Sequence, residues 1–579
     1  MLSSSAHSAF TKIGQKGSDV YTADGVGDPR VTLNTLLVRG VSEHVIREQM
    51  SSIWEMAQTD RSAMEDLWVL LFQNRDIRGG KGERSSTELM WKFLCEVDPA
   101  FVRYMLSLVP EYGCWRDLFM LPAATGAGWV RDAVLQMAVT QLRKDHQLVL
   151  KASSDYKPTV SLVAKWIPRE DRQPHLAKEL AKMMFPMIPH IGTRLKLYRK
   201  MVSAVNAYLK TVEINMCAKA FGTIEPKAVP GRALKKYTKA FLNEVAPTRK
   251  NQRLAEGQLR YPEDPDRMAC RQNFQDFFQA AAEGRVVAKA KDVVFPHELI
   301  RKIAASQSMS TDESNAVIAQ WKALVKAAQD AGGLGRSLAM CDFSGSMQSS
   351  GTNGASPYWV SMAMGLLISE ITTPGFKDSF ITFDSNPILH RMNPASNIIQ
   401  RVHDVEQSGI GQGLSTDFQK AMDLVLSNIK ANRIRPGQEP DNLIVITDMN
   451  WDAACGSDGQ SVYTGHAYRN VVKTNPWQTH IQMIREAFKR LGEDMWGVPF
   501  VPPRIVIWNV AATSDDFHAQ KDTEGVVMVS GWSPSLFKNL LKGEIRSTTP
   551  MEMLRIILDD ERYDPVRSKV TEFLLSTRG

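Results

Sequence analysis

Apolar residues recur at intervals of three and four through the first half of the chain. Val45, Ile46, Met50, Ile53 and Trp54 form one such series, and similar series follow it. This spacing places the apolar side chains on one face of a helix, so it predicts amphipathic helices. Prolines and glycines separate the segments at intervals typical of stacked helix pairs, although no fixed-period repeat is visible in the residues themselves. Further helices are expected at 130–150, 161–166, 175–184, 195–220, 232–244 and 268–283.

These helices predict an all-α, HEAT-like repeat domain over residues 32–330, behind a loosely held polar lead-in at residues 1–31. The pattern changes after residue 333. Short apolar runs at 338–341, 379–383, 443–447, 505–510 and 526–529 then alternate with helical segments at 358–370, 417–429 and 477–491. Such alternation predicts a mostly parallel sheet covered by helices on both faces. We expect a doubly wound α/β domain at 334–535, followed by helices at 536–579 that pack back on the body.

Side chains that carry oxygen follow the first predicted strand. Asp342, Ser344 and Ser346 stand at alternate positions in a loop, where three oxygens can converge on one point. Ligands of open α/β sheets bind at the carboxyl ends of strands. Asp448 ends another predicted strand, and residues 409–416 form a loop just before a helix. Hard cations such as Mg²⁺ prefer oxygen ligands of this kind, so the pattern favours a cation site at this edge.

Composition is that of an ordinary globular protein, with 43% hydrophobic and 23% charged residues among 579. No apolar run approaches the ~18 residues that a membrane helix needs, and the N-terminus lacks the apolar segment of a secretory signal. The six cysteines are scattered without a CxxC pair. This argues against a disulfide framework or a zinc site and for a reducing compartment. We therefore expect a cytoplasmic protein with no membrane partner.

Positive charge is concentrated in one part of the chain. The whole chain carries +7, whereas residues 190–253 contain 14 Lys/Arg and 3 Asp/Glu. A phosphate-rich partner and a solvated helix face both explain such a concentration. Tyr198, Tyr208 and Tyr237 lie among these charges, where they either stack on unpaired bases or belong to the core. The candidate RNA-binding residues are Arg194, Lys196, Arg199, Lys200, Arg232, Lys235, Lys236 and Lys239.

The segment RDIRGGKGER at 75–84 superficially suggests a phosphate-binding loop. A P-loop needs a glycine five positions before the glycine of the Gly-Lys pair and Ser or Thr after the lysine. Those positions hold Arg75 and Gly82. The segment is favoured as a turn between two helices, whose glycines allow unusual backbone angles. As a weaker alternative, it presents Arg78, Lys81 and Arg84 to an anion.

Three separate segments resemble the metal-ion-dependent adhesion site of von Willebrand factor A domains. They are DFSGSM at 342–347, Ser-Thr-Asp at 415–417 and Ile-Thr-Asp at 446–448. The resemblance implies that Ser344, Ser346 and Thr416 give hydroxyl ligands to a divalent cation, while Asp342 and Asp448 act through bound water. Mg²⁺ is the expected ion, with Mn²⁺ or Ca²⁺ as alternatives. An acidic group or a phosphate from a partner would complete the coordination.

The helical half resembles a TROVE-like family that is found joined to this kind of A domain. The resemblance is carried by RDIRGGKGER (75–84), EYGCWRDLF (111–119), VPGRALKKYTKAF (229–241) and FPHELIRKI (295–303). More distantly, the chain resembles the Ro autoantigen proteins. In those proteins a ring of helical repeats closed by an A domain binds structured RNA, so the resemblance implies a ring and an RNA partner, structured or single-stranded.

The leading hypothesis is a non-enzymatic, ribonucleoprotein-type RNA-binding scaffold whose A domain binds an acidic ligand of a protein partner through the metal. The alternative is a metal-dependent assembly or adhesion module, in a viral or cellular particle, without nucleic acid. A phosphotransferase that uses an aspartyl nucleophile needs a second acid two residues after Asp342, where this chain has Ser344. The sequence also contains neither HExxH nor GxSxG. We therefore expect no enzymatic activity, and a metal-dependent phosphoesterase is the third alternative.

Overall fold

The structure is a computed structural model. It describes residues 10–14, 19–245, 258–288, 295–306, 309–348, 356–384, 386–409, 418–451, 463–464, 467–468, 477–512, 514–540 and 548–578. Within these residues, a helical N-terminal region precedes a region built on a mixed sheet, which confirms the predicted order of the two regions.

The first three helices of the N-terminal region each begin at a side chain that caps them. The side chains of Asp28, Ser42 and Asp60 accept hydrogen bonds from first-turn N–H groups of α1 (Pro29–Leu36), α2 (Glu43–Ala57) and α3 (Arg61–Arg75). The region continues with α4 (Ser85–Val97), α5 (Pro99–Met105), α6 (Val109–Tyr112), α7 (Trp115–Thr125), α8 (Gly128–Leu150), α9 (Val163–Trp166), α10 (Pro174–Met184), α11 (Ile191–Tyr208), α12 (Val212–Cys217), α13 (Gly231–Phe241), α14 (Pro265–Ala282), α15 (Pro296–Ala304) and α16 (Thr311–Asp330).

Two local expectations are corrected. The helix expected over 195–220 is divided into α11 and α12, and Lys210 between them adopts a left-handed φ of 48°. A left-handed residue cannot continue a right-handed helix, so the chain changes direction there. The lead-in is not uniformly loose either. Tyr21, in β2 (Asp19–Tyr21), forms a backbone bridge with Phe517, and Val26 is fully buried.

The sheet contains five parallel strands and one antiparallel edge strand. They are β3 (Ser337–Asp342), β4 (Ser379–Phe383), β5 (Leu389–Arg391), β6 (Asn442–Thr447), β9 (Arg504–Asn509) and β10 (Val526–Ser530), and only β5 is antiparallel to its neighbour. Their order in space is β10-β9-β6-β3-β4-β5. The strands therefore run outward in both directions from the central pair β3 and β6, which makes that pair the topological switch point.

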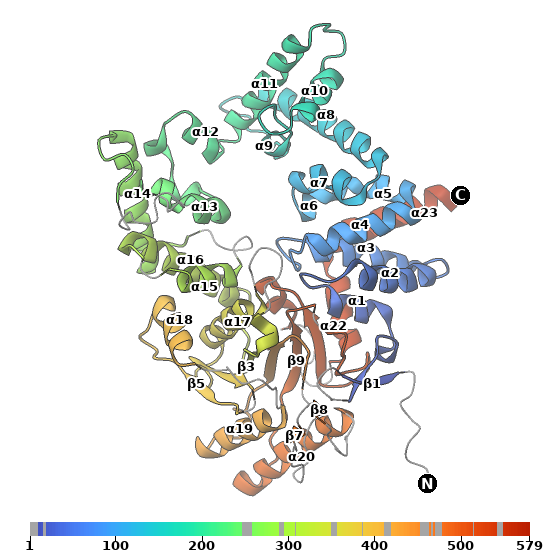
Figure 1. Ribbon diagram of the computed structural model, residues 1–579, viewed down its shortest axis with the longest axis vertical. Coiled ribbons are helices and arrows are strands. Elements are labelled where there is room, and N and C mark those ends of the chain that lie inside the picture. Colours follow the sequence, from blue (N-terminus) through green and yellow to red (C-terminus); the bar gives the residue numbers. More distant parts are fainter. Residues whose placement is uncertain are drawn as a thin grey trace.

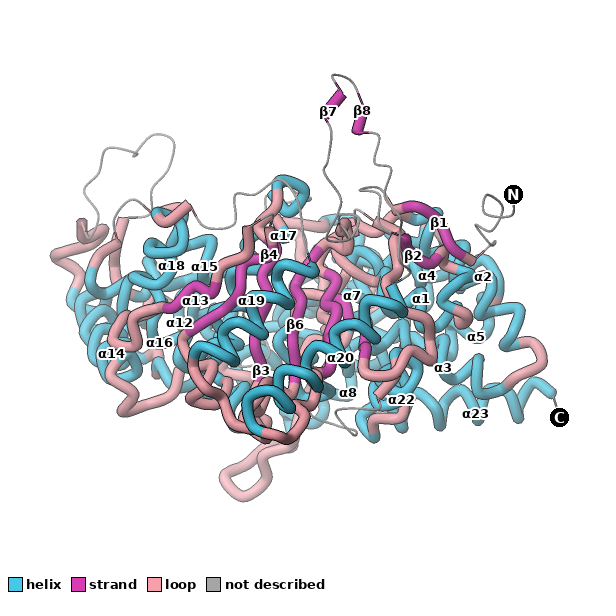
Figure 2. The backbone as a smooth tube through the Cα atoms, turned by 90° about the horizontal axis from the view of Figure 1, so that it is seen from below, coloured by secondary structure: helices cyan, strands magenta, loops and turns pink. Residues whose placement is uncertain are grey.

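Helices cover both faces of the sheet, as the continuous apolar strands require. One face packs against α17 (Pro357–Ile371), and α15 and α16 pack behind that helix. The other face packs against α19 (Phe418–Ala431) and α20 (Trp477–Trp496), which lie in front of the strands in Figure 2. The edge strand β5 and the adjoining α18 (Ile398–Gln407) complete this region. Neither element was expected from the sequence pattern.

The helical region leaves the sheet region at one side and returns to it at the other. α1 packs on β10, whereas α15 and α16 pack on α17, so helices and sheet together form a ring (Figure 1). The C-terminal helices also join the two regions. α22 (Pro550–Leu558) contacts β10, α1 and α3, and α23 (Asp564–Arg578) lies along α3 and α5.

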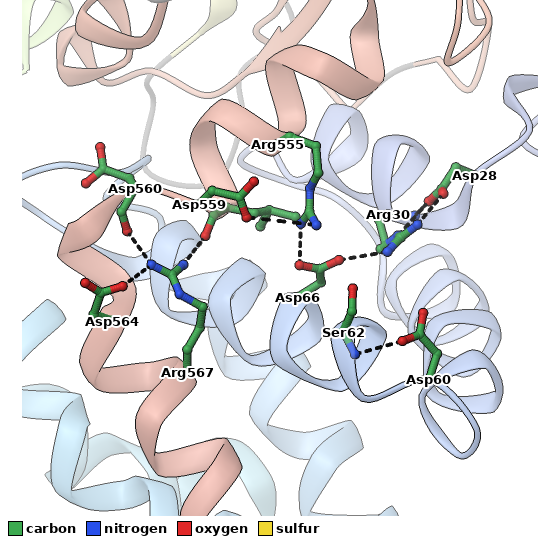
Figure 3. A network of polar contacts seen from close by, with 11 residues as sticks. Asp28, Arg30, Asp60, Ser62, Asp66, Arg555, Asp559, Asp560, Asp564 and Arg567 are labelled. Carbon is green, nitrogen blue, oxygen red and sulfur yellow. Dashed lines mark hydrogen bonds and ion pairs between the residues drawn. The ribbon is translucent and has the colours of Figure 1, made fainter.

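A buried carboxylate fastens α22 to the N-terminal helices. Asp66 in α3 accepts a 2.8 Å hydrogen bond from Arg30 in α1 and another from Arg555 in α22 (Figure 3). Arg30 also pairs with Asp28, at 2.7 Å. These ion pairs join α22 to α1 and α3.

Candidate metal centre

The two aspartates of the predicted cation site lie at the switch point of the sheet. Asp342 is the last residue of β3, and Asp448 follows the last residue of the neighbouring strand β6. Cys341 is paired with Ile446 in the parallel register, so Asp342 lies beside Thr447. Both aspartates are completely buried. The fold therefore brings together two carboxylates that are 106 positions apart in the sequence.

Asp342 is held by neutral donors. Its Oδ1 accepts the backbone N–H of Ser344 at 2.9 Å, and its Oδ2 accepts the hydroxyl of Thr447 at 3.0 Å. Burial and the nearby Asp448 carboxylate raise the pKa of Asp342. In the described part of the chain, Asp342 contacts no lysine or arginine. A buried pair of carboxylates is stabilised by a bound cation, so this charge arrangement fits a divalent ion.

The two serines of the same loop lie next to Asp342. Ser344 is buried and Ser346 is partly exposed, and their hydroxyl oxygens are 3.1 Å apart. The loop continues as a turn of 3₁₀-helix at Gly345–Gln348, which includes Ser346. The structure thus brings Asp342, Ser344, Ser346 and Asp448 close together. Thr416, the fifth residue, lies outside the described residues.

The described residues include no cluster of three or more His, Cys, Asp or Glu side chains that could hold a metal ion. The predicted centre does not depend on such a cluster, because it contains two carboxylates and otherwise uses hydroxyl groups. Hydroxyl and water ligands suit Mg²⁺, which keeps much of its hydration shell in proteins. The donor set therefore fits a hard cation and does not fit zinc.

Sequence reasoning missed an aromatic stack beneath the two aspartates. Trp451 lies between Phe418 and His518, with ring centroids 5.1 Å and 3.9 Å away. Its indole N–H donates to the Thr447 hydroxyl at 3.1 Å. The only sequence signal was the position of Trp451 three residues after Asp448, since His518 comes from a different loop of the sheet region.

Half of the candidate RNA-binding residues lie on α11. Lys196 and Lys200 are exposed, and so is Arg199, which forms an ion pair with Glu170. Arg194 is partly buried, and its guanidinium donates to the carbonyls of Ile188 and Pro186. Arg194 therefore caps the preceding turn, whereas the other three side chains face solvent.

Two of the four candidates on α13 form ion pairs with neighbouring helices. Lys235 pairs with Glu298 at 2.7 Å, and Lys239 pairs with Glu313 at 3.4 Å. These bridges tie α13 to α15 and α16 and neutralise two of the four basic side chains on α13. Arg232 and Lys236 are exposed. The Lys236 ammonium lies 4.7 Å from the centroid of the Tyr237 ring.

The tyrosines belong to the fold. Tyr198 is buried and its hydroxyl donates to the carbonyl of Pro168 at 2.6 Å. Tyr208 makes the same kind of bond to Pro158, at 2.7 Å. Tyr237 packs against Phe241. The structure therefore supports the second interpretation of these three tyrosines, in which they pack within the fold.

The loop at 75–84 joins the helical region to the sheet. Lys81 is 1% exposed, and its ammonium donates to the Ser530 hydroxyl at 2.7 Å and to the carbonyls of Asn34 and Leu37. It is therefore not available to a dissolved anion, which corrects the weaker expectation for this residue. Arg84 pairs with Asp117 at 3.0 Å, and the exposed Arg78 donates to the carbonyl of Glu111. The structure therefore supports the interpretation of residues 75–84 as a turn between two helices.

Two family models match parts of the chain. One is described as "Domain of unknown function (DUF7788)" and matches residues 336–572, and the other, "Domain of unknown function (DUF2828)", matches residues 129–251. An uncharacterized protein, L728, of Acanthamoeba polyphaga mimivirus is 26% identical over 512 residues, which cover 86% of this chain and 80% of that protein. These similarities extend through both regions of the fold.

Among solved structures, the crystal structure of the Deinococcus radiodurans RO (RSR) protein matches this chain with a TM-score of 0.39 and 14% sequence identity. The match covers 92% of this chain and 100% of that chain. The score is too low to establish a shared fold. In the described part of the chain, the helices are all too short or too polar to cross a membrane.

Proposed function

We propose that the region around the sheet is a binding domain of the von Willebrand factor A type that holds a divalent cation. One observation carries this proposal: Asp342 and Asp448 are completely buried side by side at the switch point, beside the hydroxyls of Ser344 and Ser346. Ligands of doubly wound sheets bind at this position. The strand order, with its antiparallel edge strand, also supports the assignment.

Ser344 and Ser346 would bind the ion directly, with Thr416 as a third hydroxyl ligand, and Asp342 and Asp448 would bind it through water. Mg²⁺ is the proposed ion, with Mn²⁺ or Ca²⁺ as substitutes. Two carboxylates leave such an ion able to attract a further negative ligand. The proposed partner is therefore a protein that supplies an aspartate or glutamate.

The proposed role is binding without catalysis. Both oxygens of Asp342 already accept hydrogen bonds, from Ser344 and Thr447, so this carboxylate is poorly placed to attack a substrate. His518 lies nearby, but its Nε2 is bonded to the carbonyl of Met449 and its ring is stacked on Trp451. A general base needs free access to the proton that it removes.

A thermal-shift measurement tests the cation site. Mg²⁺ or Mn²⁺ is expected to raise the Tm of the wild type, because an ion that binds only the folded state stabilises it. Ser344→Ala removes one hydroxyl ligand and is expected to abolish most of that rise. Ser52→Ala on α2, an exposed serine in the helical region, is the matched control and should respond like the wild type. An equal rise in Ser344→Ala and wild type would exclude the site.

A second function, RNA binding, is favoured by the charge of one arm of the ring. Residues 128–208, which span α8 to α11, contain 14 Lys/Arg and 6 Asp/Glu. The arm lies opposite the sheet region in Figure 1. The sugar-phosphate backbone of RNA binds such surfaces through release of counterions. Exposed lysines of this arm are Lys144, Lys151, Lys157, Lys178, Lys182, Lys196 and Lys200.

The proposed RNA surface lies on α8 to α11, whereas the sequence pattern indicated residues 190–253. The charge count singled out residues 190–253, but Lys235 and Lys239 are paired with glutamates. The arm from α8 to α11 keeps most of its lysines exposed. A metal-dependent assembly module without nucleic acid remains the alternative, and it predicts a cation response without any affinity for RNA.

A further inference from the structure

The turn after β6 has a backbone conformation that its own residues do not favour. Met449 follows Asp448 and adopts a left-handed φ of 66°, although it is not a glycine and is completely buried. Such conformations persist only where the surrounding structure holds them. The turn also carries Asp448, so the position of that carboxylate depends on whatever fixes Met449.

Both backbone groups of Met449 are held by hydrogen bonds. Its N–H donates to the hydroxyl oxygen of Thr447 at 3.1 Å. Its carbonyl accepts a 2.9 Å bond from Nε2 of His518, which must therefore carry the proton on that nitrogen. Burial lowers the pKa of His518 to about 4, which is consistent with a neutral ring in this position. His518 thus holds the left-handed residue from outside the turn.

The Thr447 hydroxyl links the turn to Asp342. It donates to Oδ2 of Asp342 at 3.0 Å and accepts from the N–H of Met449 and from the indole N–H of Trp451. With two donors directed at it, the oxygen has only its own proton to give, and that proton points to Asp342. Trp451 therefore determines the direction in which Thr447 donates.

The Trp451 ring connects the segments of the site. It stacks on Phe418, with ring planes 7° apart, and on His518, with ring planes 12° apart. Phe418 is two residues after Thr416 in the sequence. The stack therefore joins the turn that carries Asp448, the first residue of α19 and the loop that carries His518.

We propose that Trp451 and His518 are positioning residues of the cation site, which hold Thr447 and the turn at Met449 so that Asp342 and Asp448 face one ion. This inference rests on the proposed cation-binding function. Groups that orient metal ligands through hydrogen bonds typically change metal affinity by about 10–100-fold when they are replaced.

A titration of the full-length protein with Mn²⁺ alone tests the inference. Binding is measured as the decrease in the EPR signal of free Mn²⁺. Trp451→Phe keeps a stacking ring and removes the N–H that reaches Thr447. We expect its Kd for Mn²⁺ to rise by about 10–100-fold. Trp508→Phe is the matched control, because Trp508 is also buried and its indole N–H donates to the carbonyl of Gly531, on the opposite face of the sheet. That variant should bind Mn²⁺ like the wild type.

A second pair of variants keeps the test decisive if Trp451→Phe does not fold. His518→Gln retains an N–H within reach of the Met449 carbonyl and should retain affinity. His518→Leu has no donor and should lose affinity by a similar factor. Rescue by glutamine would not be expected if His518 only filled space.

The outcomes separate the inference from the function on which it rests. If the wild type does not bind Mn²⁺, the cation site itself is wrong. If the wild type binds and Ser344→Ala does not, while Trp451→Phe and His518→Leu bind like the wild type, the site stands and the positioning role is overturned. An equal loss of Mn²⁺ affinity in Trp451→Phe and Trp508→Phe would also overturn the positioning role, because a general loss of stability would then explain both losses.

Discussion

Lys81 lies where the helical region meets the sheet region, although its place in a glycine-rich turn suggests an anion site. In the structure its ammonium is enclosed between the end of α1 and the end of β10, with oxygen acceptors from Asn34, Leu37 and Ser530. Gly531 allows this approach, because a Cβ there would lie 3.3 Å from the Lys81 side chain. The hydrogen bonds of this buried amine join two regions of the molecule.

The Lys81 side chain should make folding stability depend on pH. Burial lowers the pKa of Lys81 to about 7 from its usual 10.5. Between these values the unfolded chain binds more protons than the folded one, so the free energy of unfolding contributed by Lys81 rises with pH. We expect the stability of the wild type relative to Lys81→Met to rise by roughly 2–4 kcal/mol from about pH 7 to about pH 10.

Urea denaturation of both proteins across this pH range checks the prediction. Lys489→Met is the control, because Lys489 is exposed on α20 and its replacement should give a difference that is independent of pH. A stability difference between wild type and Lys81→Met that falls as pH rises would show that the buried ammonium is not the cause.

From the sequence, only those ligands of the candidate site could be predicted that lie close together in one loop or at the end of a predicted strand. Asp342, Ser344 and Ser346 stand at alternate positions in one loop, and Asp448 ends a strand that an apolar run predicts. Trp451 and His518 carry no such signal. Their roles arise from contacts between separate loops, which periodicity does not encode.

At the scale of elements, the loop between α3 and α4 determines how the helical region meets the C-terminal helices. Asp76 is fully buried, and its carboxylate accepts hydrogen bonds from the guanidinium of Arg562 and, at 3.2 Å, from the hydroxyl of Tyr563. Gly80 turns the chain back so closely that a Cβ would lie 1.9 Å from the carbonyl oxygen of Gln73. The glycines of this segment therefore serve a close turn, not a ligand.

Removing the carboxylate of this loop should be costly. Asp76→Ala leaves the Arg562 guanidinium without its main partner in a partly buried place, so we expect a loss of about 3–5 kcal/mol in the free energy of unfolding. Chemical denaturation measures it. Glu96→Ala removes an exposed ion pair with Arg47 and should cost about 0–1 kcal/mol. If the two variants lose similar amounts, Asp76 does not have the structural role described.

Helix periodicity predicted most helices, but it could not show which charged residues on different helices form ion pairs. Lys235 and Glu298 are 63 positions apart, and their pairing depends on α13 packing beside α15. A count of charges along the sequence treats both as solvated. For the same reason, the sequence pattern extended the basic segment past α11, where the structure begins to neutralise it.

At the scale of the whole molecule, the ring is closed by contacts between distant parts of the chain. Lys81 and Ser530 are 449 positions apart. Phe295, just before α15, lies against Gly82, just before α4, because a Cβ at Gly82 would come within 3.1 Å of its ring. The two-region organisation followed from the change of periodicity after residue 333, but such long-range contacts leave no local pattern.

The basic arm of the ring makes a prediction about RNA. Lys196→Glu combined with Lys200→Glu should weaken binding of a short RNA at low salt and reduce the salt slope of log K by about 0.7–0.9 for each lost phosphate contact. A single-stranded oligonucleotide and a hairpin, compared by fluorescence anisotropy, would distinguish the two kinds of RNA. Lys489→Glu on α20 is the control and should retain binding. Wild-type protein with no salt-dependent affinity for either RNA would leave only the protein-binding function.

Anomalous scattering from a crystal of the protein grown with Mn²⁺ tests the cation site most directly. We expect one anomalous peak at the carboxyl ends of β3 and β6, about 2.1 Å from the hydroxyl oxygens of Ser344 and Ser346. A water-filled gap would separate it from Asp342 and Asp448. A map with no peak at this edge, or with Mn²⁺ only at unrelated surface carboxylates, would contradict the assignment of a cation-dependent binding domain.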